Sequence, residues 1–535
     1  MKPLTPNLAN LISLLTILIW FGLTIVIWSY QTSWALSSTL SLSTLFSLLF
    51  FSLNHWLVPG GFAWSNCPDR HGGIRGPMGW PVLGSLPEMG SGLAHQKLAH
   101  LSASLGAKRL MALSLGPTRV VISSHPDTAK EILAGSAFSD RPIKASARLL
   151  MFERAIGFAP AGNHWRHLRR IAAVHMFSPR TVNGLEGLRR RVADEMLVRV
   201  GVEMEERGVV GLRGVLQKGS LTNILESVFG GSGSCRFGEL GQMVKEGYEL
   251  ISTFNLEDYF PLGFLDFHGV KRRCHKLAAK VNSVVGQIVK ERKNMISREN
   301  HSTSENSNDF LTALLSLPEE DQLSDSDMVA ILWELIFRGT DTVAILVEWI
   351  MARMVLHQDI QAKIQLEIDT CVGKNRHVRD SDIPSLPYLQ AVVKEVLRLH
   401  PPGPLLSWAR LAVHDVHVDN VFIPAGTTAM VNMWAIAHDP SSWKDPWAFR
   451  PDRFVEEEVT IMGSDLRLAP FGSGRRICPG KALGLTTVHA WLARLLQQYT
   501  WLPAQLVDLS ECLRLSMEMK TPLACHVVRR YNIAG

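Results

Sequence analysis

Residues 471–480 read Phe-Gly-Ser-Gly-Arg-Arg-Ile-Cys-Pro-Gly, and no other stretch of the chain says more about its fold. Gly474 and Gly480 let the backbone turn tightly and approach the sulfur of Cys478. The proline after the cysteine stiffens the loop before a helix predicted over residues 482–498. The stretch therefore predicts a rigid loop that presents a cysteine close to the start of a helix.

The chemistry of Cys478 needs an explanation beyond packing. The seven cysteines are scattered, odd in number and form no CxxC pair, which excludes a disulfide framework or a zinc site of paired cysteines. A cysteine thiolate is, however, a ligand of haem iron that favours O–O cleavage. Phe471 can keep water from the sulfur, and Arg476 can bind a haem propionate. Cys478 is thus the predicted metal ligand of haem b; the alternative is a glycine-rich turn with an incidental buried cysteine.

This loop resembles the cysteine loop of the cytochrome P-450 family, FxxGxRxCxG, at every specified position. The resemblance extends over nearly the whole chain beyond its apolar N-terminal part. It implies a haem-thiolate monooxygenase with a mainly α-helical fold and small β-sheets. Trp165 and Arg169 match the family's WxxxR, whose members contact a propionate. Arg410 follows a proline-rich run, and for it a propionate contact and a surface position are equally supported.

Three further charged residues match structural elements of the family. Glu395 and Arg398 fit its ExxR pair, and a spacing of three places both on one face of a helix. That helix is predicted from near Leu389 to His400, because two prolines follow. Arg453 lies in a PERF-like stretch and is expected to complete a buried Glu–Arg–Arg cluster that supports the cysteine loop.

A long apolar helix is predicted from Ser324 to about His357, through the centre of the protein. Within it, residues 339–342 (Gly-Thr-Asp-Thr) resemble the family's (A/G)GxDT element. Activation of dioxygen requires two protons at its distal oxygen, and Asp341 with Thr342 and ordered water can supply them. Alternatively, the threonine bonds its own backbone and the aspartate pairs with a nearby base.

Arg338 departs from the family pattern, which has a small residue at this position. An ion pair within the helix, with Glu334 or Asp341, is the simpler interpretation. The other interpretation makes Arg338 a cation of the substrate pocket that holds a substrate carboxylate. Loops over residues 143–161 and 253–267 are expected to line this pocket, and their phenylalanines suit a lipophilic substrate or belong to ordinary core.

Residues 1–32 are predicted to form an N-terminal transmembrane anchor. The first 68 residues contain no charged side chain besides Lys2, and the run from Leu8 to Trp28 is long enough to cross a hydrocarbon core of about 30 Å. The competing interpretation is a cleaved signal peptide, but the run exceeds the usual core of such peptides. Basic residues after the apolar part favour a cytosolic catalytic domain.

The rest of the chain divides into three predicted segments. Residues 33–68 form a second apolar segment, rich in serine, that is either a second span or an interfacial helix. Prolines and glycines in residues 69–90 predict a stiff, non-helical hinge. Residues 91–535 then form the haem domain, with strands expected at 119–123 and 415–423.

The charge and the motifs of the chain indicate which macromolecules it can bind. The chain has 535 residues, 19% of them charged, and a net charge of +6 without a dense basic stripe, so nucleic-acid binding is not predicted. No GxGxxG or flavin segment is present, so the resemblance implies that a separate NADPH–cytochrome P-450 reductase supplies electrons. Arg475 and Lys481 are candidates for steering its acidic face. The resemblance also implies the endoplasmic reticulum membrane, with the catalytic domain facing the cytosol.

In detail, the chain resembles family 78, subfamily A, a plant group linked to organ size and seed growth. The resemblance rests on residues 336–344, on residues 76–81 and on the two-part apolar leader. It implies insertion of one oxygen atom from O₂ into a C–H bond of a lipophilic substrate, with fatty acids as the associated class. Two other functions stay open, a haem-thiolate isomerase or dehydratase acting on hydroperoxides and a non-catalytic membrane haem sensor.

Overall fold

The computed structural model describes residues 57–65, 67, 74–90, 92–231, 234–253, 255, 258–260, 266, 269–298, 309–406 and 409–531. The predicted anchor and most of the second apolar segment lie outside these residues. Within the described ranges, no helix combines the length and the apolar character needed to cross a bilayer.

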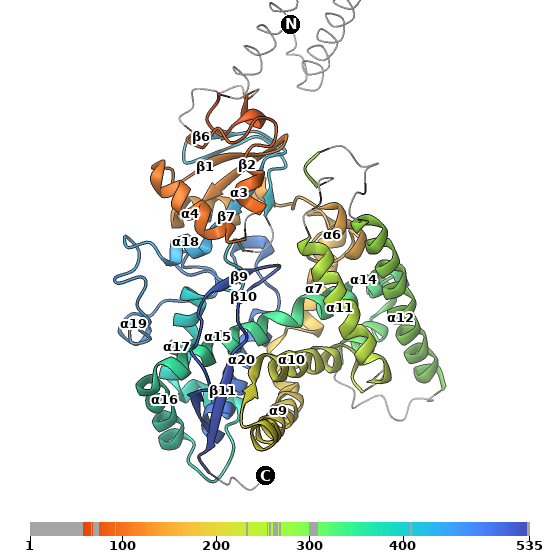
Figure 1. The fold of residues 1–535 in the computed structure, drawn as a ribbon. Coiled ribbons are helices and arrows are strands. Elements are labelled where there is room, and N and C mark those ends of the chain that lie inside the picture. Colours follow the sequence, from red (N-terminus) through yellow and green to blue (C-terminus); the bar gives the residue numbers. More distant parts are fainter. Residues whose placement is uncertain are drawn as a thin grey trace, which may run out of the picture.

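The fold is mainly α-helical with small β-sheets, as predicted. Strands β1, β2, β6 and β7 gather at the end of the molecule nearer the N-terminus, and long helices build most of the rest (Figure 1). The hydrophobic cores follow the same division. Two large clusters lie among the helices, and two smaller ones lie around the sheet at the N-terminal end.

The largest sheet brings together segments that lie far apart in the sequence. Its strand order is β1 (Met111–Leu115), β2 (Thr118–Ser123), β7 (Thr428–Val431) and β4 (Arg410–Leu411). β2, predicted from its β-branched residues, pairs in parallel with β7. Helix α5 (Pro126–Ala134) follows β2 directly and leads toward the cysteine loop.

The second predicted strand is instead a hairpin. The structure divides residues 415–423 into β5 (Val416–Val418) and β6 (Val421–Ile423), which pair antiparallel. Between them Asp419 and Asn420 have φ angles of 51° and 64°. Such left-handed conformations in a two-residue loop favour asparagine and aspartate, so this turn could have been recognised in the sequence.

The long central helix is broken. It consists of α14 (Asp325–Gly339) and α15 (Asp341–Leu356), so the prediction of one continuous helix is wrong. Its start is as predicted, because the Ser324 hydroxyl caps the first turn. At the break, the Thr340 hydroxyl donates to the carbonyl of Ile336 at 2.7 Å and so competes with the helical hydrogen bonds.

Several helices pack against α15 and fix its position. α10 (Leu212–Phe229), α17 (Pro387–Leu399) and α20 (Lys481–Gln498) pack against it, and α9 (Glu186–Arg207) packs behind α10 and α20. The helices predicted at residues 389–400 and 482–498 are therefore present as α17 and α20. α12 (Val270–Arg298) covers α14.

The other α-helices are α3 (Leu86–Gly90), α4 (Ala94–Ser104), α6 (Ala145–Leu150), α7 (Asn163–His175), α8 (Pro179–Gly184), α11 (Phe237–Ser252), α13 (Phe310–Leu315), α16 (Gln358–Cys371), α18 (Met433–Ala437) and α19 (Arg453–Glu456). The short 3-10 helices are η1 (Phe62–Trp64), η2 (Ser136–Phe138), η3 (Ser234–Arg236), η6 (Glu319–Asp321), η7 (Asp380–Ser385) and η8 (Gly474–Arg476). The remaining strands are β3 (Val210–Gly211), β8 (Tyr499–Pro503), β9 (Glu511–Leu513), β10 (Met517–Met519) and β11 (Ala524–Arg529).

The folded domain begins before residue 91. Trp64 is only 2% exposed, and its indole nitrogen donates to the carbonyl of Leu113 in β1 at 2.9 Å. The predicted hinge is not wholly non-helical either, because its last five residues form α3. Leu86 at the start of α3 is buried against the sheet, which stabilises this turn of helix, and Pro87 is compatible with it because a proline in the first turn costs no helical hydrogen bond.

The predicted Glu–Arg–Arg cluster is assembled in the core. Glu395 and Arg398 on α17 are 0% exposed and form two hydrogen bonds of 2.9 Å. Arg453 lies 3.1 Å from the same carboxylate. Arg398 also donates to the carbonyls of Ala437 (2.8 Å) and Pro446 (2.7 Å). The cluster therefore ties the irregular segment before the cysteine loop to α17.

We expect Glu395→Gln to lower the free energy of unfolding by about 3–5 kcal/mol, because it leaves two buried arginines without their counter-charge. Urea unfolding followed by circular dichroism would measure this loss. Glu456→Gln is the matched control, since its pair with Arg450 lies on the surface and is worth at most about 1 kcal/mol. Equal effects of the two variants would contradict a supporting role for the cluster.

Candidate active site

The cysteine loop runs from η8 into α20 and presents Cys478 between them. The amide of Cys478 donates to the carbonyl of Phe471 at 2.9 Å, which closes the loop, and the cysteine side chain is half-buried. α20 begins three residues later. The partial positive charge at the start of a helix stabilises a nearby thiolate.

Gly474 allows the loop to lie directly on the end of α5. Its φ angle is +68°, and a Cβ there would lie 2.2 Å from the carbonyl oxygen of Leu133. Gly472 has a similar φ of +72°, but a Cβ there would meet nothing within 4 Å. Gly474 is therefore required for both its backbone conformation and its close packing, whereas Gly472 is required for conformation alone.

Two side chains beside the break of the central helix remain accessible. Thr342 is exposed and Arg338 is half-buried, while most of the α14 and α15 side chains are buried. Gly339 is not part of this accessible surface, because a Cβ there would lie 2.8 Å from the Ile224 side chain of α10. We call the surface formed by Thr342 and Arg338 the open face.

Arg169 lies between the cysteine loop and this open face. It donates to the carbonyl of Ile477, next to Cys478, at 2.5 Å. Burial lowers the pKa of Arg169; Cys478 acts in the opposite direction, and Arg338 adds to the lowering. The structure thus brings the predicted Arg169 to the cysteine and within electrostatic range of α14.

Arg476 and Trp165, each predicted to contact a propionate, contact one another. The Arg476 guanidinium lies 4.3 Å from the centre of the Trp165 ring and donates to the carbonyls of Ile156 (3.1 Å) and Ala159 (2.7 Å). The Trp165 indole nitrogen also donates to Ile156, at 3.0 Å. Both residues therefore fasten the loop of residues 151–161 beside the cysteine loop.

Arg410 is buried, which overturns the surface alternative for this residue. It is 4% exposed and donates to the carbonyl of Ser473 at 3.2 Å. Burial lowers its pKa to about 10, with further lowering by Arg476 and Arg169. Arg141 belongs to the same group, because burial and the neighbouring Arg410 bring its pKa well below the usual value. No sequence motif marks Arg141.

These arginines form a surplus of buried positive charge. Asp140, 3.6 Å from Arg476, is a nearby carboxylate, and Glu334 on α14 acts on the group from the other side. Within the described residues, Asp140 and Glu334 are fewer than the arginines Arg169, Arg410 and Arg476, and Glu334 also pairs with Arg338. A ligand with two carboxylates of its own would add negative charge, and the two propionates of haem fit that requirement. The residues present thus fit haem bound through Cys478.

Asp341 and Thr342 lie at the break of the central helix. Burial raises the pKa of Asp341 to about 6; Glu518 raises it further and Arg213 lowers it. A carboxyl group with this pKa carries a proton in part of the molecules near neutral pH, which suits a proton donor. The exposed Thr342 side chain adjoins it on the open face.

Arg338 pairs with Glu334 at 3.2 Å, the first of the two partners that the sequence offered, and no ion pair with Asp341 is found within the described ranges. Its side chain remains 34% exposed toward the open face. The loop of residues 143–161 supplies Phe158, which is buried in the core next to α14. Most of the loop of residues 253–267 lies outside the described residues.

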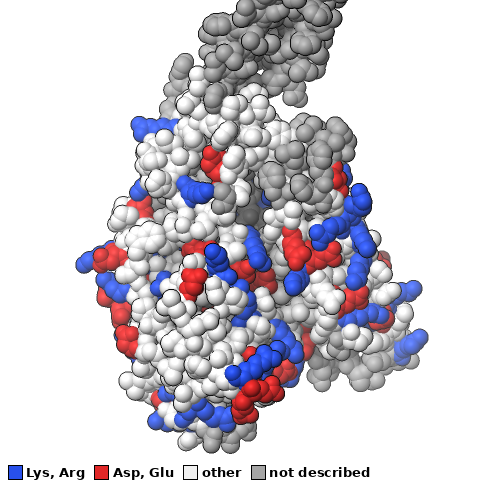
Figure 2. Space-filling view, in the orientation of Figure 1, with Lys and Arg blue, Asp and Glu red and all other residues white. Residues whose placement is uncertain are grey.

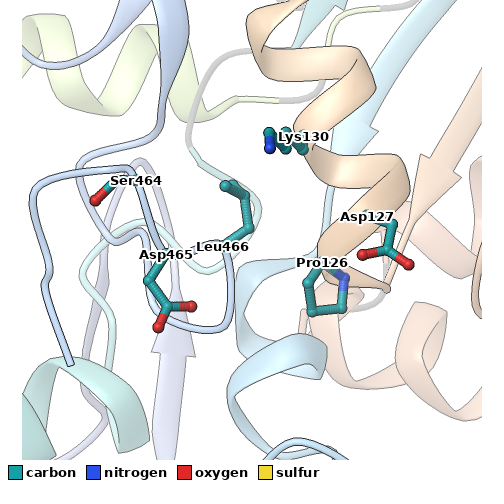
Figure 3. A pocket seen from close by; sticks show the side chains of 6 residues that line it. All are labelled: Pro126, Asp127, Lys130, Ser464, Asp465 and Leu466. Atoms are coloured by element: carbon teal, nitrogen blue, oxygen red, sulfur yellow. The ribbon is translucent and has the colours of Figure 1, made fainter. Parts of the chain in front are cut away.

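A separate hollow of about 430 Å³ lies between α5 and the segment before the cysteine loop (Figure 3). It is lined by Pro126, Asp127 and Lys130 of α5 and by Ser464, Asp465 and Leu466 of that segment. None of the predicted site residues lines it. Its charged lining does not suit a lipophilic substrate.

Comparisons with known proteins show the family of this chain. The sequence model of the family named Cytochrome P450 matches residues 74–525. The chain belongs to the cytochrome P450 family. It is 51% identical to cytochrome P450 78A5 of Arabidopsis thaliana over 90% of this chain and 94% of that one, and 51% identical to cytochrome P450 78A3 of Glycine max over 88% and 91%.

The comparisons extend to other enzymes and to solved structures of this family. Flavonoid 3'-monooxygenase of Arabidopsis thaliana is 34% identical over 84% of this chain and 90% of its own. A zebra fish cytochrome P450 solved with progesterone superposes with a TM-score of 0.70 at 25% identity, over 82% of this chain and 99% of that one. The chain is accordingly a plant-type haem monooxygenase that receives electrons from a redox partner.

We expect Gly474→Ala to lower the ratio of bound haem to protein, because its Cβ would push the cysteine loop away from α5. Gly472→Ala is the control. It bears a similar left-handed strain of about 1–2 kcal/mol without the backbone clash, so its haem content should stay near that of the wild type. Haem absorbance against protein mass gives the ratio. Equal losses in both variants would show that conformation alone, and not the packing on α5, matters.

Proposed function

We propose that the protein inserts one oxygen atom of O₂ into a C–H bond of a lipophilic substrate, with Cys478 as the thiolate ligand of haem b. The second oxygen atom leaves as water, with two protons and with two electrons from NADPH through a separate reductase. The observation that carries the proposal is the surplus of buried arginines beside Cys478, opposite the open face that carries Thr342.

The chain's own residues would hold the haem from two sides. Cys478 would bind the iron, and Phe471, half-buried against the core, would keep water from the sulfur. Arg169, Arg410 and Arg476 would donate to the propionates, with Trp165 supporting Arg476. When bound, a haem with a thiolate ligand supplies the activation of dioxygen.

Asp341 and Thr342 would deliver the protons. Asp341 holds a proton at its carboxyl group, and Thr342 can pass one into the open space through its hydroxyl. The half-buried Arg338 lies one helical turn before Thr342, so we place it at the edge of the substrate pocket. There it can bind an acidic group of the substrate while Glu334 keeps the guanidinium oriented.

We infer that the domain sits on the endoplasmic reticulum membrane, anchored by residues 1–32 and facing the cytosol. Trp80 and Val82, each 58% exposed, offer apolar surface in the first part of the described chain. On the face in Figure 2, charges of both signs are interspersed and become sparser toward the N-terminal end. The exposed Arg475 beside the cysteine loop suits an acidic face of the reductase.

We propose fatty acids as the substrate class. Lipophilic side chains such as Phe158 beside α14 and the resemblance to family 78, subfamily A, support this class. A role in the growth of plant organs or seeds rests on that resemblance alone.

The central test is Cys478→Ala. The reduced wild-type protein treated with carbon monoxide should show the Soret band of a thiolate-bound haem, and the variant should lack it, because no sulfur reaches the iron. Cys512→Ala is the control, since Cys512 is equally half-buried but lies in β9. Persistence of the band in Cys478→Ala would refute the assignment. Rearrangement or dehydration of a fatty-acid hydroperoxide itself, without NADPH, reductase or oxidation of a second substrate, would favour the isomerase or dehydratase instead.

The pH dependence of turnover tests Asp341. As the pH rises through about 6, Asp341 loses its proton, so the yield of product per NADPH should fall. Asp341→Asn should abolish this dependence and slow turnover by about 10²-fold or more. Glu518→Gln should shift the fall to lower pH, because Glu518 raises the pKa of Asp341. A pH profile of Asp341→Asn that matches the wild type would rule out this role.

A further inference from the structure

Two side-chain hydroxyl groups occupy the helical hydrogen-bonding positions at the break between α14 and α15. In a regular helix, the carbonyls of Ile336 and Phe337 would accept from the amides of Thr340 and Asp341. Here the Thr340 hydroxyl donates to Ile336, and the hydroxyl of Tyr248, from α11, donates to Phe337. The Thr340 hydroxyl comes from a residue at the break itself, whereas the Tyr248 hydroxyl comes from another helix.

Tyr248 lies beside both ends of the interrupted hydrogen bond. Its hydroxyl donates to the Phe337 carbonyl, and the backbone of Asp341, whose amide would otherwise bond to that carbonyl, lies close enough to lower the pKa of the hydroxyl. Burial, together with Asp341, raises the pKa of Tyr248 well above its usual value, so the hydroxyl keeps the proton that it donates. The hydroxyl group thus satisfies the carbonyl of the open rung and lies beside the residue that carries its amide.

The packing of α11 directs Tyr248 to this place. The Tyr248 and Phe337 ring centres are 4.5 Å apart. At Gly247, a Cβ would lie 2.6 Å from the Phe337 ring, so only glycine lets α11 approach α14 this closely. The ring contact and the missing Cβ are independent of the hydrogen bonds, and both hold the hydroxyl against the break.

We propose that Tyr248 is a positioning residue for proton delivery, which holds the helix open so that Asp341 and Thr342 face the reacting oxygen. α11 ends at Ser252, directly before the predicted pocket loop of residues 253–267. Tyr248 thereby connects the substrate side of the protein with the site of proton transfer. The proposal rests on the monooxygenase function proposed above.

The test is Tyr248→Phe in the haem-loaded full chain with reductase, with dodecanoic acid as the probe. The variant keeps the ring against Phe337 and loses only the hydroxyl. Coupled turnover converts substrate, O₂, NADPH and a proton into hydroxylated product, water and NADP⁺. Without proton delivery to the distal oxygen, the same two electrons and two protons reduce O₂ to hydrogen peroxide, which is released. We expect product per NADPH to fall roughly tenfold to a hundredfold, with a matching rise in peroxide.

Two controls separate positioning from general damage. Tyr499→Phe removes another buried tyrosine hydroxyl that donates to a backbone carbonyl, that of Leu197, away from the break, and should stay coupled. Turnover driven by an alkyl hydroperoxide needs no electrons from NADPH, since it starts at the oxidation level of peroxide, and should survive in Tyr248→Phe. If Tyr248→Phe does not fold, Thr340→Val tests the other hydroxyl, with the same expected release of peroxide.

Several results would overturn the role of Tyr248. One such result is a Tyr248→Phe variant that forms as much product per NADPH as the wild type. Another is an equal loss of hydroperoxide-driven and NADPH-driven turnover in the variant. If the wild type does not oxidise dodecanoic acid, the proposed substrate class is wrong, and peroxide released per NADPH without substrate still decides the role of Tyr248. Absence of the thiolate Soret band in the wild type would instead refute the proposed function itself.

Discussion

The proposed active site depends on keeping the sulfur of Cys478 in one place, where it can bind haem iron as a thiolate. A thiolate in the interior is costly unless backbone dipoles and cations stabilise it, so the loop around Cys478 must be rigid. Three contacts supply that rigidity. Gly474 lies against the last residues of α5, the Ser473 hydroxyl donates to the carbonyl of Gly463 at 2.6 Å, and Arg169 donates to the carbonyl of Ile477. The Glu395 cluster secures the segment that leads into this loop.

The second feature of the site is its group of buried arginines. Burial of several arginines with few carboxylates lowers their pKa values, and such an arrangement costs stability in the absence of an anionic ligand. A cofactor with two carboxylates offsets the charge, so binding and folding should reinforce one another. The same cations hold the backbone carbonyls of residues 156 and 159, so the loop near the open face is organised together with the cofactor site.

At the centre of the fold, the break between α14 and α15 replaces regular helical hydrogen bonds with bonds from side chains. A continuous helix would satisfy the backbone of residues 336–341 by itself, but it would also hold Asp341 and Thr342 in regular helical positions. Hydroxyl groups of Thr340 and Tyr248 instead donate to the carbonyls of Ile336 and Phe337 at the break. The deviation from regular structure therefore coincides with the residues proposed to deliver protons.

The sequence by itself determined the features that short-range physics controls. The cysteine loop, the cap at Ser324, the helix that ends before the prolines and the Glu395–Arg398 pair were all predicted, because each depends on residues a few positions apart. Tertiary structure alone decided the rest. It buried Arg410, added Arg141 to the cations, folded Trp64 onto β1 and brought Tyr248 to the helix break. These contacts join residues tens to hundreds of positions apart, and no local pattern of propensity or spacing records which distant side chain will fill a given gap.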